Sequence, residues 1–95
     1  MSVIRIVRPP MLTPETYDQV NATMGVAQDP PDGLLMHSAG EVDGAFQIVD
    51  VWESEEAARR FDAERLGPAV AAVMGAAPPG EPPTTMYELH SLIQP

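Results

Sequence analysis

One histidine and one aspartate are placed to meet across a predicted β-hairpin. His37 lies in the first strand and Asp50 in the second, and Asp43-Gly44 between them is a strong signal for a tight turn. A two-residue turn places His37 directly opposite Asp50, whereas a four-residue loop makes them diagonal neighbours. A three-residue loop would put them on opposite faces of the hairpin.

This pair could carry proton-transfer chemistry. A carboxylate beside an imidazole fixes the tautomer of the ring and favours its protonated form, and a general base or a proton shuttle requires both effects. We therefore predict that His37 and Asp50 are catalytic. The alternative is a polar pair that only stabilises the sheet or a subunit interface, because paired titratable groups mark functional sites only statistically.

A phenol and a carboxamide are expected on the same side of the first helix. Thr13 followed by Pro14 is typical of a helix start, and Tyr17 and Asn21 lie four residues apart on its apolar stripe. Both side chains should point at the sheet, where they could bind a substrate carbonyl or enolate. Alternatively, Tyr17 is a core aromatic with its hydroxyl at the rim, and Asn21 makes only local hydrogen bonds.

Two further aromatic residues could line a binding pocket for a planar ligand. We predict that Trp52 and Phe61 do so, with core packing as the more common alternative for Trp52. Arg5, within the apolar first strand, either meets an acidic ligand group or pairs with a carboxylate such as Asp50 or Glu88. We expect His90 either near a subunit interface or in the pocket. The sheet face that it occupies depends on the register of the last strand, which the sequence does not determine.

Composition limits the classes of partner and cofactor. The 95 residues predict a single domain (1–95), and the net charge of −9, with five Arg and no Lys, disfavours nucleic acid and anionic membranes. There is no cysteine, no glycine-rich phosphate loop and no tight cluster of metal ligands, so we expect neither a cofactor nor a metal. Without a membrane span or a secretory signal, we place the protein in the cytoplasm.

The hydrophobic period predicts the order β-α-β-β-α-β. We expect a strand at Ser2–Val7, a helix from Thr13 to Gly25, strands at Leu34–Ala39 and Ala45–Glu53, a helix capped by Ser54, and a last strand at Thr84–Leu92. Gly67-Pro68 should break the second helix before another short segment, and Ala77–Pro83 should form a stiff connector. This order predicts a ferredoxin-like α+β domain, a four-stranded antiparallel sheet with helices on one face.

The predicted helix after Ser54 separates into a charged side and an apolar side. Ala57, Ala58 and Phe61 should turn inward. Two acid-base pairs at a spacing of four, Glu55/Arg59 and Glu56/Arg60, should mark the solvent side.

Both faces of the hairpin are apolar. One face should carry Leu34, Met36, Val49 and Val51, and the other Leu35, Phe46, Ile48 and Trp52. Because the helices can cover only one face, the pattern predicts a face-to-face homodimer.

The segments GLLMHSAG, DGAFQIVDVWES and EAARRFDAERLGP resemble the dimeric α/β barrel superfamily, and within it small proteins related to the antibiotic biosynthesis monooxygenases. The resemblance implies two ferredoxin-like protomers that close a barrel across a two-fold axis, with a small-molecule pocket between sheet and helices. Members include cofactor-free oxygenases, polyketide cyclases, isomerases, haem-degrading enzymes and proteins without known activity, so the fold alone selects no reaction.

The hypothesis that follows is a cofactor-independent enzyme for a small apolar molecule, aromatic or polyketide-like. It would oxygenate, cyclise or isomerise this substrate by proton transfer, with His37 and Asp50 as the proton-transfer pair. Tyr17 and Asn21 would orient a carbonyl or phenolate oxygen, and Trp52 and Phe61 would wall the pocket. The alternatives are a non-catalytic binding or accessory protein, and a structural dimer whose His/Asp pair tunes association.

Overall fold

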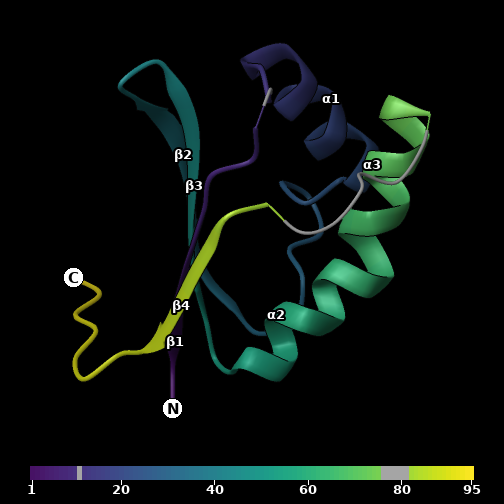
Figure 1. Cartoon of the computed structure of the whole chain (residues 1–95). Helices are drawn as coiled ribbons and strands as arrows, with labels where there is room; N and C mark the ends of the chain where they lie inside the picture. The colour runs from purple at the N-terminus through teal and green to yellow at the C-terminus, as the bar shows by residue number, and fades with distance from the viewer. Residues whose placement is uncertain (11, 76–81) are drawn as a thin grey trace.

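A four-stranded antiparallel sheet with helices on one side forms the chain. The computed structural model describes residues 1–10, 12–75 and 82–95. Its elements are β1 (Val3–Val7), α1 (Pro14–Met24), β2 (Leu34–Val42), β3 (Ala45–Trp52), α2 (Glu55–Phe61), η1 (Asp62–Leu66), α3 (Gly67–Met74) and β4 (Thr84–Glu88). The strand order is β2-β3-β1-β4, and the helices cover one face of the sheet (Figure 1). The predicted ferredoxin-like α+β fold is confirmed. The predicted connector Ala77–Pro83 lies, except for its last two residues, outside the described residues.

The β2-β3 hairpin closes with the shorter of the predicted turns. Val42 pairs with Ala45, and the two residues between them, Asp43 (φ 53°) and Gly44 (φ 80°), are both left-handed. This backbone is a type I′ turn, whose twist matches that of the flanking strands. His37 therefore lies directly opposite Asp50, as the two-residue turn predicts. β2 continues to Val42, three residues beyond the predicted end.

A β-bulge changes the faces at the start of β2. Leu34 pairs with Trp52 but Met36 pairs with Val51, so Leu35 is an extra residue without a partner in β3. The extra residue turns Leu34 to the helix side, where it packs against the core. The predicted grouping of Leu34 with Met36 is wrong for this reason.

The helical backbone does not break at Gly67-Pro68. It continues from α2 through five residues of π-helix, η1, into α3 (Figure 1). The Gly67 N–H donates to the Asp62 carbonyl, five residues back, and a Cβ on Gly67 would lie 3.1 Å from that oxygen. Pro68 lies in the first turn of α3, where a missing N–H costs least. The predicted break is therefore a widened turn in a continuous helical run.

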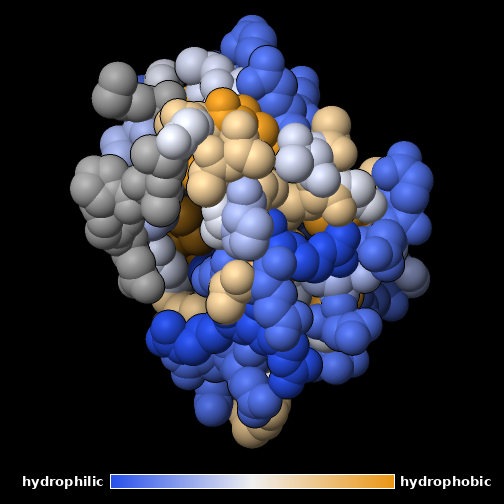
Figure 2. Space-filling model, turned by 90° about the vertical axis from the view of Figure 1, so that its right-hand side faces the viewer, coloured by the Kyte–Doolittle hydropathy of each residue, from blue (hydrophilic) through white to orange (hydrophobic). Residues whose placement is uncertain are grey.

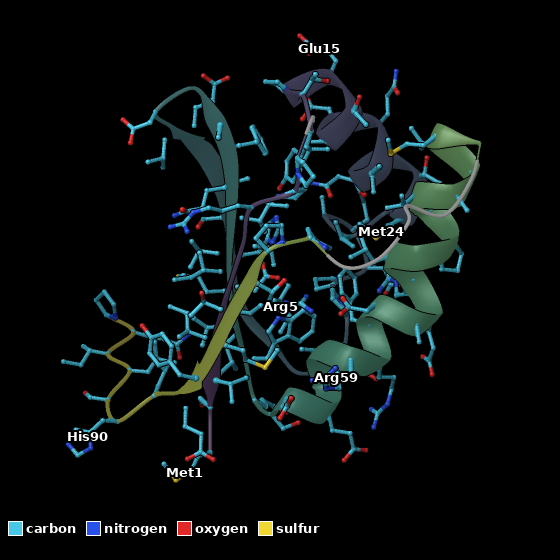
Figure 3. The ribbon with its side chains drawn as sticks, viewed as in Figure 1. Met1, Arg5, Glu15, Met24, Arg59 and His90 are labelled. Carbon is cyan, nitrogen blue, oxygen red and sulfur yellow. The ribbon has the colours of Figure 1, made fainter. Side chains whose placement is uncertain are left out.

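β4 is shorter than predicted and is followed by an irregular tail. It ends at Glu88, although the Leu89 N–H still donates to the Ser2 carbonyl. The tail turns to the side of the sheet opposite the helices, and His90 points away from the helical layer (Figures 1 and 3). His90 is thus exposed and lies outside any strand.

The core between sheet and helices is small. It consists of Val3, Trp52, Ala57 and Ala58, with Leu34, Phe61 and Met86 packed against it. On the helical face, hydrophilic side chains cover the part formed by α2, and hydrophobic ones gather over α3 (Figure 2). The predicted pairs Arg59–Glu55 (2.7 Å) and Arg60–Glu56 (2.9 Å) are present on α2. Among the described residues, no helix has the length and apolar character to cross a membrane.

The close approach of Gly33 to α2 generates a testable prediction. Gly33 has φ +85°, and a Cβ there would lie 2.7 Å from the Ala57 Cβ. We expect Gly33→Ala to lower the free energy of unfolding by about 2 kcal/mol or more, because backbone strain and overpacking add. Gly40→Ala is the matched control, since nothing lies within 4 Å of its Cβ position, and we expect a change within about 0.5 kcal/mol. Equal losses in urea denaturation would contradict the packing argument.

Candidate active site

Tyr17, His37 and Asp50 form a continuous hydrogen-bonded chain from α1 to the sheet. The Nδ1 atom of His37 lies 2.5 Å from Oδ1 of Asp50, and the Nε2 atom is hydrogen bonded to the Tyr17 hydroxyl. The rings of Tyr17 and His37 are nearly parallel, with centroids 5.9 Å apart. The hairpin register positions the histidine and aspartate, and the capped first turn of α1 positions the tyrosine.

Arg5 and Asp62 extend this chain on its inner side. Arg5 pairs with Asp50 across β1 and β3, and its Nη2 atom lies 3.3 Å from Asp50 Oδ2. Its Nη1 atom donates to Asp62 Oδ2 at 2.6 Å, so the π-helix is tied to the sheet. In Figure 3 the Arg5 side chain lies between the sheet and the helical layer. Of the two alternatives for Arg5, pairing with a carboxylate is confirmed.

The charges along the chain are compensated in its buried part. Asp50 is 3% exposed and Arg5 5%, and burial of unpaired charges would cost several kcal/mol for each ion. The guanidinium is a permanent cation, so the Asp50 carboxylate always has an opposite charge beside it. Asp62 is shared between this cluster and solvent, since 41% of its side chain is exposed.

Hydrogen-bond partners assign the tautomer of His37. A carboxylate only accepts hydrogen bonds, so Nδ1 carries the proton that is donated to Asp50. Nε2 is then the acceptor for the Tyr17 hydroxyl. Such an arrangement can take up a proton at Nε2 and hold it beside Asp50, which is the chemistry of a general base.

The accessible end of the chain consists of the His37 imidazole on β2 and the Tyr17 phenol on α1. One third (33%) of the His37 side chain is exposed, and Tyr17 is half-buried. Phe46, near the tip of the hairpin, packs on Tyr17 with ring centroids 5.1 Å apart. Solvent or a small molecule can therefore reach the phenol and the imidazole, but not Asp50.

Other predicted site residues lie deeper or apart. Trp52 is 1% exposed and packs against Phe61, with ring centroids 5.2 Å apart, so both belong to the core region. The guanidinium carbon of Arg5 lies 5.7 Å from the centre of the Trp52 ring. Asn21 is one turn beyond Tyr17, half-buried, and within the described part of the chain its side chain makes no hydrogen bond. The structure thus brings Tyr17, His37 and Asp50 together and leaves Asn21 unconnected.

Asp62 is the member of the cluster that the sequence prediction missed. The spacing contained a usable signal, because Asp62 follows the inward-facing Ala58 by four residues and so lies on the same helix side. An acidic residue on that side needs a cation on the facing sheet surface. Arg5 is the one arginine within the first strand.

Two surface pockets lie away from this chain of residues. One of about 350 Å³ is lined by Met1, Val3, Ser54, Glu55, Met86, Tyr87 and Glu88, and one of about 280 Å³ by Thr23, Met24, Glu64, Arg65, Pro68 and Ala69. Neither includes Tyr17, His37 or Asp50. In residues 1–10, 12–75 and 82–95, no three acidic or histidine side chains cluster as a metal site would require.

Solved structures from several bacteria share this fold. No protein-family profile and no curated protein sequence matches the chain. A candidate antibiotic biosynthesis monooxygenase from Deinococcus radiodurans superposes with a TM-score of 0.61 and 20% identity, covering 99% of this chain and 97% of its own. SnoaB, a cofactor-independent oxygenase from Streptomyces nogalater, gives 0.57 and 17%, covering 97% and 93%. A dimeric ferredoxin-like protein of unknown function from Thermobifida fusca gives 0.60 and 16%, covering 94% and 92%.

At these identities the likeness establishes the fold. The chain has the ferredoxin-like architecture of the antibiotic biosynthesis monooxygenase-like structures, and the structural resemblance predicted from the sequence is confirmed.

The buried pair generates the second prediction. We expect Arg5→Met to lower the free energy of unfolding by about 3–5 kcal/mol, because it leaves the Asp50 carboxylate buried without its cation. Arg8→Met is the matched control. Arg8 is exposed, and within the described residues its side chain bonds only Gln47 (2.8 Å), so we expect a change within about 0.5 kcal/mol. Chemical denaturation measures both, and equal effects would show that the Arg5–Asp50 contact stabilises nothing.

Proposed function

We propose that this protein is a homodimeric, cofactor-independent enzyme that acts on a small, largely apolar molecule, aromatic or polyketide-like. The reaction is an oxygenation, cyclisation or isomerisation that begins with abstraction of a proton. The observation that carries the proposal is the hydrogen-bonded chain Tyr17–His37–Asp50, which has a buried charged end and an accessible end. The fold shared with a cofactor-independent oxygenase supports the same class of chemistry.

Each group in the chain has a role in this reaction. Asp50 holds the Nδ1–H of His37 and stabilises the imidazolium that forms when Nε2 takes a proton. Arg5 keeps the buried carboxylate compensated and fixed. In the proposed proton-transfer pair, His37 is the base. The Asp50 carboxylate beside it already supplies the negative charge that the imidazolium needs.

The other residues proposed to bind the substrate differ in how deeply they are buried. Tyr17 reaches the substrate oxygen or proton directly, because it lies at the accessible end. The Asn21 carboxamide, one helical turn away, makes no hydrogen bond to the described residues, and its N–H groups can donate to a substrate carbonyl. Trp52 and Phe61 pack in the apolar core beside the polar cluster. They can contact a ligand only if the packed core moves.

The dimer is proposed from the apolar side chains on the sheet face opposite the helices. Met36 (43% exposed) and Tyr87 (51%) lie on the face opposite the helices, beside the half-buried Ile4, whereas Val51 on the same face is already buried within the chain.

The third prediction tests the chemistry. Anthrone, a planar aromatic ketone with an acidic methylene group, is the probe, since oxygenation, cyclisation and isomerisation share a first step that exchanges this proton. We expect the wild type to accelerate loss of deuterium from the methylene, and His37→Ala and Asp50→Asn to lower the rate on the order of 10²-fold or more. NMR spectroscopy measures the exchange.

Ser38→Ala is the matched control in β2, because the Ser38 hydroxyl bonds only the Val49 carbonyl (3.4 Å) and its side chain is on the opposite face. If folded His37→Ala protein exchanges as fast as the wild type, the catalytic role is wrong. Stabilisation by anthrone without exchange would identify a non-catalytic binding protein.

The fourth prediction tests the assembly. We expect Met36→Asp to shift the protein from dimer to monomer, because it buries a charge in the proposed apolar interface. Met74→Asp is the matched control on α3, where Met74 is 58% exposed on the helical side. Sedimentation equilibrium distinguishes the two, and a Met36→Asp protein that remains dimeric would place the interface elsewhere.

A further inference from the structure

We propose that Tyr17, and not His37, is the group that removes the proton from the substrate, with His37 acting through it. This inference rests on the proposed function and assigns the reacting atom within it. Its basis is the position of the Tyr17 hydroxyl on Nε2 of His37, the ring nitrogen that does not donate to Asp50 and so can accept a proton.

Nε2 is already occupied in the structure. Nδ1 donates to Asp50, so Nε2 is an acceptor, and it receives the Tyr17 O–H. A substrate proton that approached Nε2 directly would have to displace this phenol. The Tyr17 oxygen, in contrast, has lone pairs that its bond to His37 does not use, and it lies at the accessible end of the chain.

The proton transfers balance without an oxidant or reductant. The phenolic proton of Tyr17 moves to Nε2 of His37, and the proton of an acidic substrate C–H or O–H moves to the Tyr17 oxygen. The products are the substrate anion, a neutral Tyr17 and an imidazolium whose charge is compensated by Asp50. Reversal of both transfers returns the proton at the end of the reaction.

The surroundings of Tyr17 indicate the kind of substrate. Phe46 lies beside the phenol with its ring tilted by 49° and its centroid 5.1 Å from that of Tyr17. A flat apolar molecule can pack on Phe46 while its acidic hydrogen points at the Tyr17 oxygen. We therefore place the substrate against the solvent-accessible part of Tyr17 and His37, next to Phe46, rather than in the packed region around Trp52.

The test compares Tyr17→Phe with His37→Ala in the deuterium exchange of anthrone. We expect the exchange rate of Tyr17→Phe to be lower than that of the wild type on the order of 10²-fold or more, as for His37→Ala. The double variant should exchange no more slowly than either single variant. Phe46→Ala should raise KM more than it lowers kcat. Tyr87→Phe is the matched control, because this tyrosine lies on the opposite sheet face, and we expect an unchanged rate.

Two outcomes separate this inference from the proposed function. If Tyr17→Phe exchanges at the wild-type rate or faster while His37→Ala is inactive, His37 is the direct base and only the inference is overturned. If the wild type does not exchange, the proposed function is overturned and the inference falls with it.

A measurement without substrate keeps the inference falsifiable if Tyr17→Phe does not fold. The ¹⁵N NMR spectrum of the wild-type imidazole should show a protonated Nδ1 and an unprotonated, hydrogen-bonded Nε2. A neutral ring with its proton on Nε2 would overturn the inference, since Tyr17 could not then donate to it.

Discussion

The buried carboxylate of Asp50 is the constraint on which the other parts of the structure depend. A charge at 3% exposure requires compensation, and the compensation comes from two neighbouring strands, through Arg5 on β1 and His37 on β2. Each contact requires one register of its strand pair, because a slip by one residue would turn the partner to the other face. The polar cluster thus selects the same pairing that the apolar core favours, and the sheet and the candidate site are specified together.

The π-helix connects this cluster to the helical layer. Asp62 is the first residue of η1, and its carboxylate reaches Arg5 while its carbonyl accepts the Gly67 N–H. The wider turn begins where the helix must present an acid to the sheet, and π-helical segments recur at functional sites. Arg5 is shared between Asp62 (2.6 Å) and Oδ2 of Asp50 (3.3 Å), while Oδ1 of Asp50 bonds His37. The helical layer is therefore linked to the imidazole through Arg5 and Asp50.

Local signals made much of the fold predictable from sequence. The caps at Thr13 and Ser54, the stop at Gly25 and the turn at Asp43-Gly44 each depend on a few adjacent residues, and all four are present. The turn in particular determined that His37 faces Asp50. Local chemistry was sufficient there because hairpin register follows from turn length alone.

The features that sequence reasoning missed depend on contacts between distant segments. The bulge at Leu35 places Leu34 against the core, and no residue type in β2 predicts this bulge. Likewise, Gly67-Pro68 is compatible with a break, and only the packing of α3 against α1 shows why the helical run continues. Asp62 meets Arg5 across 57 positions of sequence, so their pairing needed the register of β1, which no local pattern supplies.

The division of the cluster into a rigid end and an accessible end follows from the small size of the core. The space between sheet and helices is filled at one end by Trp52, Ala57 and Ala58, whose bulk leaves Arg5 and Asp50 without solvent. Towards the hairpin tip the side chains become exposed, because β2 and β3 extend beyond β1 and α1 covers only part of them. A polar chain that crosses this gradient necessarily has its charges fixed inside and its last hydrogen bond near solvent. Proton transfer requires that arrangement, since the charge must be stabilised where water is excluded and the proton must be exchanged where a substrate can enter.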